Sequence, residues 1–222
     1  MDPLNLVYDL ARGPLVWVAV VVFLVGAVVQ VYRMWSLTSA ARPVENLPRS
    51  LKPVERKKLP LGVRLRLSVA GTSPVTVVVT TVFHLCLVIT PLFVLGHNIL
   101  VDNAWGASLF SFPEGFSDFL TLVVVACAGY FLVRRIFYER VRLISTPWDY
   151  LFLALAAGPF ITGALAYHQI FDYKLMITAH MLLGELMLIA IPFTKFAHML
   201  FFPVFRFAVA SEYSLGNGRR TW

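Results

Sequence analysis

Five histidines are the residues of this sequence whose type and spacing could do chemistry. His84 and His97 lie in one long apolar segment, His180 and His198 lie in another, and His168 follows a third. Ionisable side chains at membrane depth are costly and are usually functional. Because imidazole nitrogens ligate haem iron and other transition metals, these positions are candidate ligands.

The spacing of the histidines predicts two levels of ligands. His180 and His198 are eighteen residues apart, which is five turns and about 27 Å of an uninterrupted helix, so both rings are expected to leave the same face of one helix. His84 and His97 are thirteen residues apart, or about 20 Å. In antiparallel helices, His84 lies level with His198, and His97 lies level with His180. Bis-histidine ligation of two stacked haems needs one histidine from each helix at each level.

A straight helix does not satisfy this arrangement for the first pair. Thirteen residues leave His84 and His97 about 140° apart around an ideal helix. Thr90 and Pro91 lie between them. We therefore expect a proline kink or a π-bulge in this helix, which would reset the phase.

Other interpretations of these side chains have less support. The histidines could instead hydrogen-bond between helices as structural contacts. Zinc is disfavoured because neither level offers a third or fourth ligand. The two cysteines, Cys86 and Cys127, form no C-x-x-C motif, so covalent c-type haem and a cysteine-ligated iron–sulfur cluster are unsupported.

The elements that must position the histidines are membrane-spanning helices. The chain has 222 residues, of which 59% are hydrophobic and 14% charged, whereas about a quarter of the residues in a soluble domain are charged. A bilayer core of about 30 Å needs roughly 20 apolar residues in a helix. We predict an all-α integral membrane bundle that forms a single domain over residues 1–222, with spans at 14–35, 74–101, 116–133, 148–167 and 175–205. The first span is interpreted as a retained anchor because its leader lacks a basic n-region.

The basic residues predict the orientation of these helices. The net charge is +7, and the Lys and Arg residues lie in blocks between spans, which indicates topology signals and not nucleic-acid binding. Nine lie at 32–68, four at 134–147 and three in the C-terminal tail, against Arg12 and Lys174 on the other side. The N-terminus is therefore predicted outside and the C-terminus inside. The basic loop at 36–73 is either a solvated loop against anionic lipid or a docking surface for a cytoplasmic partner.

The motifs around the histidines resemble those of a known family. The chain is similar to the gamma subunit of respiratory nitrate reductase and to the related cytochrome b subunits of transmembrane redox complexes in sulfate-reducing microbes. The residues that carry the resemblance are Phe83-His84, Phe93-x-x-Gly96-His97, and the stretch from His180-Met-Leu-Leu-Gly184 through Pro192-Phe-Thr-Lys195 to His198. It extends over all five spans and includes residues 145–150 and Thr162-Gly163.

The resemblance implies two b-type haems and a quinone. The inner haem would be held by His84 and His198, and the outer haem by His97 and His180. A menaquinone-type quinone would react near the outer haem, beside Gly96, and electrons would pass to or from a cytoplasmic iron–sulfur subunit. A periplasmic multihaem cytochrome c and other membrane subunits are further expected partners, and the prokaryotic cytoplasmic (inner) membrane is the expected location.

Two departures qualify the resemblance to the nitrate reductase form. The thirteen-residue spacing is longer than in that form, and residues 102–116 contain no lysine, whereas that family's quinone pocket uses a lysine after the second helix. Both departures favour the sulfate-reducer branch.

Two other polar residues are candidates for the quinone site. Glu185 lies within the fifth span, where it is interpreted either as a proton carrier for quinone chemistry or as a carboxyl group hydrogen-bonded to another helix. His168, near Gln169 and Asp172, either lines the quinone pocket or lies at the interface. The predicted function is electron transfer in anaerobic respiration, as a subunit of a quinone-linked oxidoreductase. The alternative is a non-redox membrane anchor or transporter subunit with structural histidines.

Overall fold

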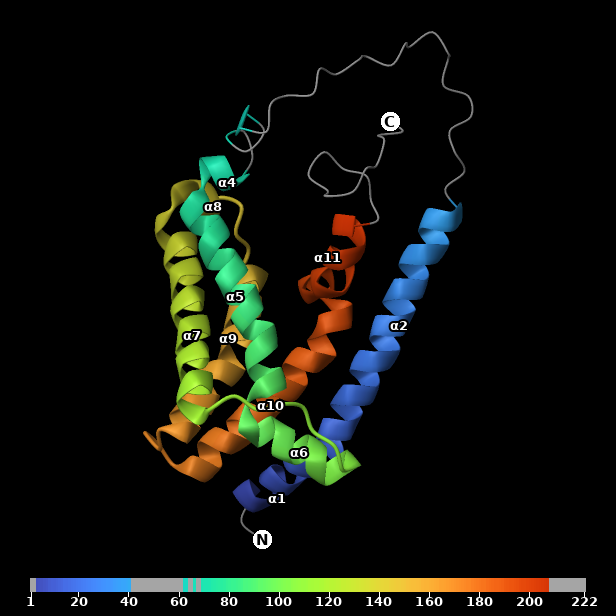
Figure 1. Cartoon of the computed structure of the whole chain (residues 1–222), viewed down its shortest axis with the longest axis vertical. Helices are drawn as coiled ribbons and strands as arrows, with labels where there is room; N and C mark the ends of the chain where they lie inside the picture. Colours follow the sequence, from blue (N-terminus) through green and yellow to red (C-terminus); the bar gives the residue numbers. More distant parts are fainter. Residues whose placement is uncertain (1–2, 41–61, 64–65, 67–68, 208–222) are drawn as a thin grey trace. The chain divides into compact units, whose positions relative to one another are not determined.

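The computed structural model describes residues 3–40, 62–63, 66 and 69–207, and this part of the chain is helical and contains no strand (Figure 1). Five helices are long and apolar enough to cross a membrane; they cover Pro3–Leu37, Pro74–Phe93, Glu114–Phe137, Pro147–Tyr167 and Tyr173–Phe193. Many large apolar side chains on them are exposed, as expected for helices surrounded by lipid. The predicted class, an all-α protein with five spanning helices, is confirmed.

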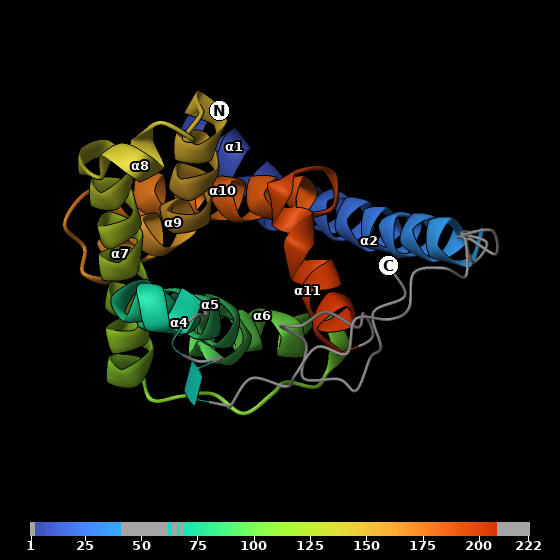
Figure 2. The same cartoon turned by 90° about the horizontal axis from the view of Figure 1, so that it is seen from above.

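The helices group into two compact units, and each is described by itself. Unit 1 contains the N-terminal elements and, from Ile177 on, the C-terminal ones: α1 (Pro3–Leu10), η1 (Ala11–Leu15), α2 (Val16–Ala40), α10 (Tyr173–Phe193), η2 (Lys195–Ala197) and α11 (His198–Phe207). Unit 2 contains α4 (Val69–Thr72), α5 (Pro74–Phe93), α6 (Leu95–Trp105), α7 (Glu114–Phe137), α8 (Glu139–Arg142) and α9 (Pro147–Tyr167). In unit 2, α7 packs against both α5 and α9 (Figure 1 and Figure 2).

The first span begins earlier than the sequence predicted. We expected it to start at Pro14, but the helix runs without a break from Pro3. Pro14 lies inside the π-helical turn η1. Proline has no N–H and its ring clashes with the carbonyl one turn before it, and the wider π turn accommodates both effects within a continuous helix.

The second predicted span, 74–101, is two helices. Val94 is extended, with φ −70° and ψ 133°, and separates α5 from α6. The expected distortion between His84 and His97 is therefore present, as a break three residues after Pro91 and not as a kink or π-bulge. Helix α6 ends at Trp105 and is followed by Gly106, whose φ of +68° is a left-handed conformation that suits glycine.

The fifth predicted span, 175–205, is also interrupted. α10 ends at Phe193, Thr194 is extended (φ −126°, ψ −170°), and η2 leads into α11. His180 and His198 therefore lie on different helices, and the prediction that both leave one face of a single helix is wrong. Pro192 weakens the helix here, and the Thr194 hydroxyl accepts the Phe196 N–H at 3.2 Å, which competes with helix continuation.

The side chains of α2 stabilise this interruption in unit 1. Gln30 donates from Nε2 to the Pro192 carbonyl at 2.7 Å. Carbonyls at the end of a helix lack helical partners, and in a membrane they need another donor. One turn before Gln30, Gly26 is buried beside Pro192, where a Cβ would lie 2.7 Å from the proline Cγ. The two helices approach closely at this glycine.

A polar side chain also secures the α6–α7 connection of unit 2. Asn98 is 3% exposed and donates from Nδ2 to the Ser111 hydroxyl at 2.9 Å and to the Phe110 carbonyl at 3.3 Å. The Phe112 N–H donates to the Phe93 carbonyl at 2.9 Å. These bonds fold the connection back onto the junction of α5 and α6, beside His97.

The third and fourth spans agree with the prediction within four residues at each end. α7 extends the predicted 116–133 by two residues at its start and four at its end, and α9 extends 148–167 by one residue. α9 begins with Pro147, and Asp149 Oδ2 accepts both the backbone N–H and the hydroxyl of Thr146 at 2.8 Å. In the predicted loop 36–73, residues 41–61, 64–65 and 67–68 lie outside the described residues.

Candidate functional site

His84 lies on the exposed surface of α5 with one ring nitrogen held by the backbone. Its Nδ1 lies 2.7 Å from the carbonyl oxygen of Thr80, one turn earlier. The ring also meets Phe83 edge-on, with centroids 5.4 Å apart, and Phe83 packs in the same way on Phe131 of α7 at 5.3 Å. These contacts fix the orientation of the imidazole on α5.

His97 has an equivalent contact in the first turns of α6. Its Nδ1 lies 2.8 Å from the carbonyl oxygen of Pro91. That carbonyl belongs to the last turn of α5, where helical partners run out. Because the helix is interrupted at Val94, the direction of His97 around α6 is not fixed by that of His84 around α5. The interruption also lets the imidazole of His97 reach back to the Pro91 carbonyl of α5.

His198 repeats the pattern in unit 1. Its Nδ1 lies 2.6 Å from the carbonyl oxygen of Lys195, in the short turn η2. Thr194 holds this turn in place, since its hydroxyl donates to the Ala190 carbonyl at 2.7 Å. The fourth predicted ligand, His180, lies half-buried within α10.

The three contacts define the tautomer of three imidazoles. A carbonyl oxygen only accepts hydrogen bonds, so Nδ1 must carry the proton in His84, His97 and His198. The neutral ring then has its lone pair on Nε2. Metal-ligating histidines usually donate their other ring N–H to a carbonyl or carboxylate, which orients the ring and raises its basicity.

The predicted pairs each take one histidine from each unit. His84 and His97 belong to unit 2, and His180 and His198 belong to unit 1. The pairing of His84 with His198 and of His97 with His180 therefore stays a prediction. Among the described residues, no three His, Cys, Asp or Glu side chains gather as they would around a bare metal ion; bis-histidine haem ligation needs only two imidazoles for each iron.

His168 forms a hydrogen bond with Asp118 that was not predicted from the sequence. It lies at the C-terminal end of α9, and its Nε2 lies 2.9 Å from Oδ1 of Asp118 on α7. The side chain of His168 is 42% exposed and that of Asp118 is 20% exposed. The available signal was an acidic residue within the apolar third span, near the predicted outer end. Asp172, in contrast, receives the Leu175 N–H at 2.8 Å and caps the start of α10.

Gly96 and Glu185 have contrasting surroundings. Gly96 is exposed, and a Cβ added to it would meet no atom within 4 Å. Glu185 is 7% exposed in unit 1, and its Oε1 has no hydrogen-bond partner among the described residues. Both predicted roles of Glu185, as a proton carrier and as a carboxyl group hydrogen-bonded to another helix, stay predictions.

Comparison with known proteins places the chain beside one bacterial relative. A protein of Nitratidesulfovibrio vulgaris (strain Hildenborough) is 32% identical to it over 220 residues, which cover 96% of both proteins. No protein-family model matches the chain, and no solved structure matches it. The similarity therefore extends over nearly the full length of both proteins.

Proposed function

This chain belongs to the family of the Nitratidesulfovibrio vulgaris protein, and for it we propose the function of a membrane dihaem cytochrome b. It would be a subunit of a respiratory oxidoreductase complex. Its role would be to pass electrons between a menaquinone-type quinone and a cytoplasmic iron–sulfur subunit. The proposal fits a chain with five membrane-spanning helices and four histidines within or beside them.

The observation that carries the proposal is the shared contact of three imidazoles. His84, His97 and His198 each donate from Nδ1 to a backbone carbonyl at 2.6–2.8 Å. Each ring is thus oriented with its lone pair on Nε2, as a haem ligand requires. Two of these three contacts involve local turns created by helix breaks, at Val94 and Thr194.

The assignment of ligands follows the two predicted levels. His84 and His198 would hold the inner haem, and His97 and His180 the outer one. Haem would supply one-electron transfer when bound, while the protein supplies ligands, burial and proton access. The buried residues beside His84 and His97, Phe83 and Asn98, fix the local backbone of α5 and α6.

The proton chemistry of a quinone assigns roles to three further residues. Oxidation of a quinol releases two electrons and two protons, and reduction of the quinone takes up both. The His168–Asp118 pair can exchange a proton at His168 Nδ1 or at the Asp118 carboxylate. Glu185, about 7 Å from His180 along α10, would hold a proton inside the membrane. Gly96 would let a planar ring approach closely.

The orientation and partners remain part of the proposal. The Lys and Arg asymmetry favours an outside N-terminus and an inside C-terminus in a prokaryotic inner membrane. The quinone site then lies at the outer end, with α6 and the end of α9. A cytoplasmic iron–sulfur subunit would meet the basic face, and a periplasmic multihaem cytochrome c and other membrane subunits are further partners.

The first test is the haem content of the purified protein. We expect about two low-spin haem b per chain in a pyridine haemochrome assay, because four histidines form two ligand pairs. Fewer than about one haem per chain would contradict the proposal. Absence of any haem absorbance would favour the non-redox anchor or transporter subunit.

The second test concerns the quinone. We expect Gly96→Leu and His168→Ala each to slow haem reduction by a menaquinol analogue at least about tenfold, measured by stopped flow. The leucine at position 96 would block the approach of the quinol ring, and the loss of His168 would remove a proton acceptor. Asp118→Asn should have a smaller effect, since the imidazole remains.

The matched control for the second test is Gly115→Leu. Gly115 lies in the first turn of α7, is exposed, and has no atom within 4 Å of an added Cβ, as at Gly96. This variant should reduce at the wild-type rate. If Gly96→Leu and His168→Ala are inert while Met199→Ala, beside His198, abolishes reduction, the quinone site lies at the predicted inner end.

A further inference from the structure

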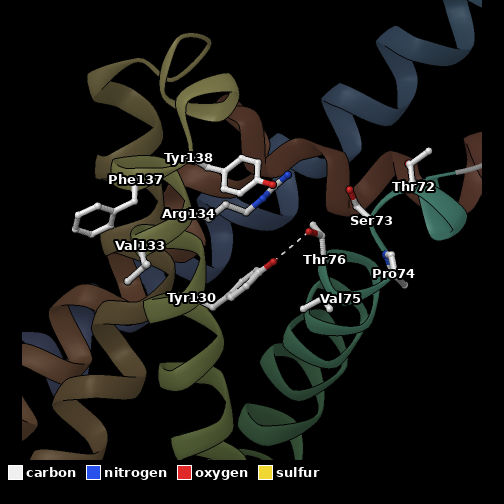
Figure 3. Close-up of a pocket in the computed structure, with 10 residues that line it drawn as sticks. All are labelled: Thr72, Ser73, Pro74, Val75, Thr76, Tyr130, Val133, Arg134, Phe137 and Tyr138. Atoms are coloured by element: carbon white, nitrogen blue, oxygen red, sulfur yellow. Dashed lines mark hydrogen bonds between the residues drawn. The ribbon is translucent and has the colours of Figure 1, made fainter.

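A pocket of about 380 Å³ lies between the start of α5 and the end of α7, within unit 2 (Figure 3). Its position is where two membrane-spanning helices end, on the side of the four arginines at 134–147. The histidines of the proposed redox function do not line it. The pocket therefore calls for a separate explanation.

The polar part of the pocket is a single cation with hydroxyl groups around it. Arg134 is half-buried and extends from α7 toward the α5 side (Figure 3). Within the described part of the chain, its guanidinium has no hydrogen bond or ion pair, and none of the residues that line the pocket is acidic. Ser73 and Tyr138 add hydroxyl groups to the lining, and the Tyr130 and Thr76 hydroxyls bond to each other at 3.1 Å.

Arg134 differs from the neighbouring arginines in being half-buried without a partner among the described residues. Arg135 donates from a guanidinium nitrogen to the Ser145 hydroxyl at 3.1 Å and so ties α7 to the turn before α9. Arg140, on α8, is exposed and lies outside the pocket. A half-buried guanidinium that has no partner among the described residues is suited to bind an anion.

The apolar part of the pocket continues toward the membrane. Val75, Val133 and Phe137 line it and are exposed, at 62%, 54% and 76% respectively. An anionic group alone would leave these side chains uncovered. A ligand with an anionic head and hydrocarbon chains would pair with Arg134 and cover them as well.

We propose that this pocket binds one anionic phospholipid of the leaflet that faces the basic loops. The headgroup phosphate would accept hydrogen bonds from Arg134 and from the Ser73 and Tyr138 hydroxyls. The acyl chains would lie along Val75, Val133 and Phe137. This binding does not depend on haem or on quinone, so it can be tested separately from the proposed function.

The experiment counts lipids retained by the intact purified protein in native mass spectrometry. Samples are loaded with phosphatidylglycerol or with phosphatidylcholine. We expect one phosphatidylglycerol to be retained, at least tenfold more than phosphatidylcholine. Arg134→Gln should reduce its retention at least tenfold. Arg140→Gln, which removes the same charge outside the pocket, should retain lipid like the wild type.

Two further variants test lipid binding if Arg134→Gln does not fold. Arg134→Lys keeps the charge and should retain the lipid within a few-fold of wild type, whereas Val75→Trp fills the apolar wall and should reduce retention. Inorganic phosphate at millimolar concentration should not displace the lipid. Displacement by phosphate would instead indicate a free-anion site, and equal loss in Arg134→Gln and Arg140→Gln would indicate unspecific surface charge; either result overturns the proposal.

Discussion

Replacing His84 or His198 with alanine is expected to abolish the same haem transition in a redox titration of the purified protein. His97→Ala and His180→Ala should each abolish the other one. Each variant should lose about half of the haem absorbance, because an iron with one imidazole no longer holds its low-spin haem. The physical basis is the two predicted levels, together with the Nδ1 contacts at His84, His97 and His198.

This series of variants tests which histidines pair on each haem separately from whether the protein binds haem at all. If His84→Ala and His180→Ala abolish the same transition, the pairing across the two units is wrong even though two haems are bound. His168→Ala is the matched control, because it removes an imidazole at the end of α9 that is bonded to Asp118 and is no predicted ligand. It should keep both transitions.

Gly26→Ala is expected to lower the free energy of unfolding by about 1–3 kcal/mol, the usual cost of overpacking a tight site. The new Cβ would lie 2.7 Å and 2.8 Å from Cγ and Cβ of Pro192 and 3.1 Å from the Phe193 ring. Pro192 is fully buried and its ring cannot rotate away. The backbone of α2 or α10 must therefore move, which would also lengthen the bond from Gln30 to the Pro192 carbonyl.

The measurement is unfolding in mixed micelles during a titration with sodium dodecyl sulfate. Gly129→Ala provides the control, because Gly129 is an exposed mid-helix glycine of α7 with nothing within 4 Å of an added Cβ. Its stability should stay equal or rise by about 0.5–1 kcal/mol, since alanine favours helix over glycine. Equal stability of the Gly26→Ala and wild-type proteins would show that α2 and α10 do not approach closely at this site.

The five spans could be predicted from the sequence because a lipid core imposes one requirement on every segment. Each must be apolar over about 20 residues and must pair its backbone groups internally as a helix. This requirement is local, so α7 and α9 were located within four residues of their observed bounds. The histidines could be singled out in the same way, because a polar side chain in an apolar run is visible without any knowledge of packing.

The interruptions of the helices depended on tertiary structure. Pro91 and Pro192 were visible in the sequence, but a proline in a membrane helix can be kinked, bulged or accommodated, as Pro14 is within η1. The result depends on which groups satisfy the released carbonyls. Gln30, 162 residues before Pro192 in the sequence, does so for the Pro192 carbonyl, and the imidazole of His97 does so for the Pro91 carbonyl. Helical periodicity carries no information on such partners.

The sequence by itself therefore determined the all-α membrane class, the number of spans and the choice of the histidines as candidate ligands, through composition and local spacing. Only the tertiary structure decided which imidazole nitrogen carries the proton, that His180 and His198 lie on different helices, and that His168 meets Asp118. The physical reason is that hydrogen bonds and close packing between helices join residues that are far apart in the chain. Their geometry depends on backbone breaks at single residues such as Val94 and Thr194.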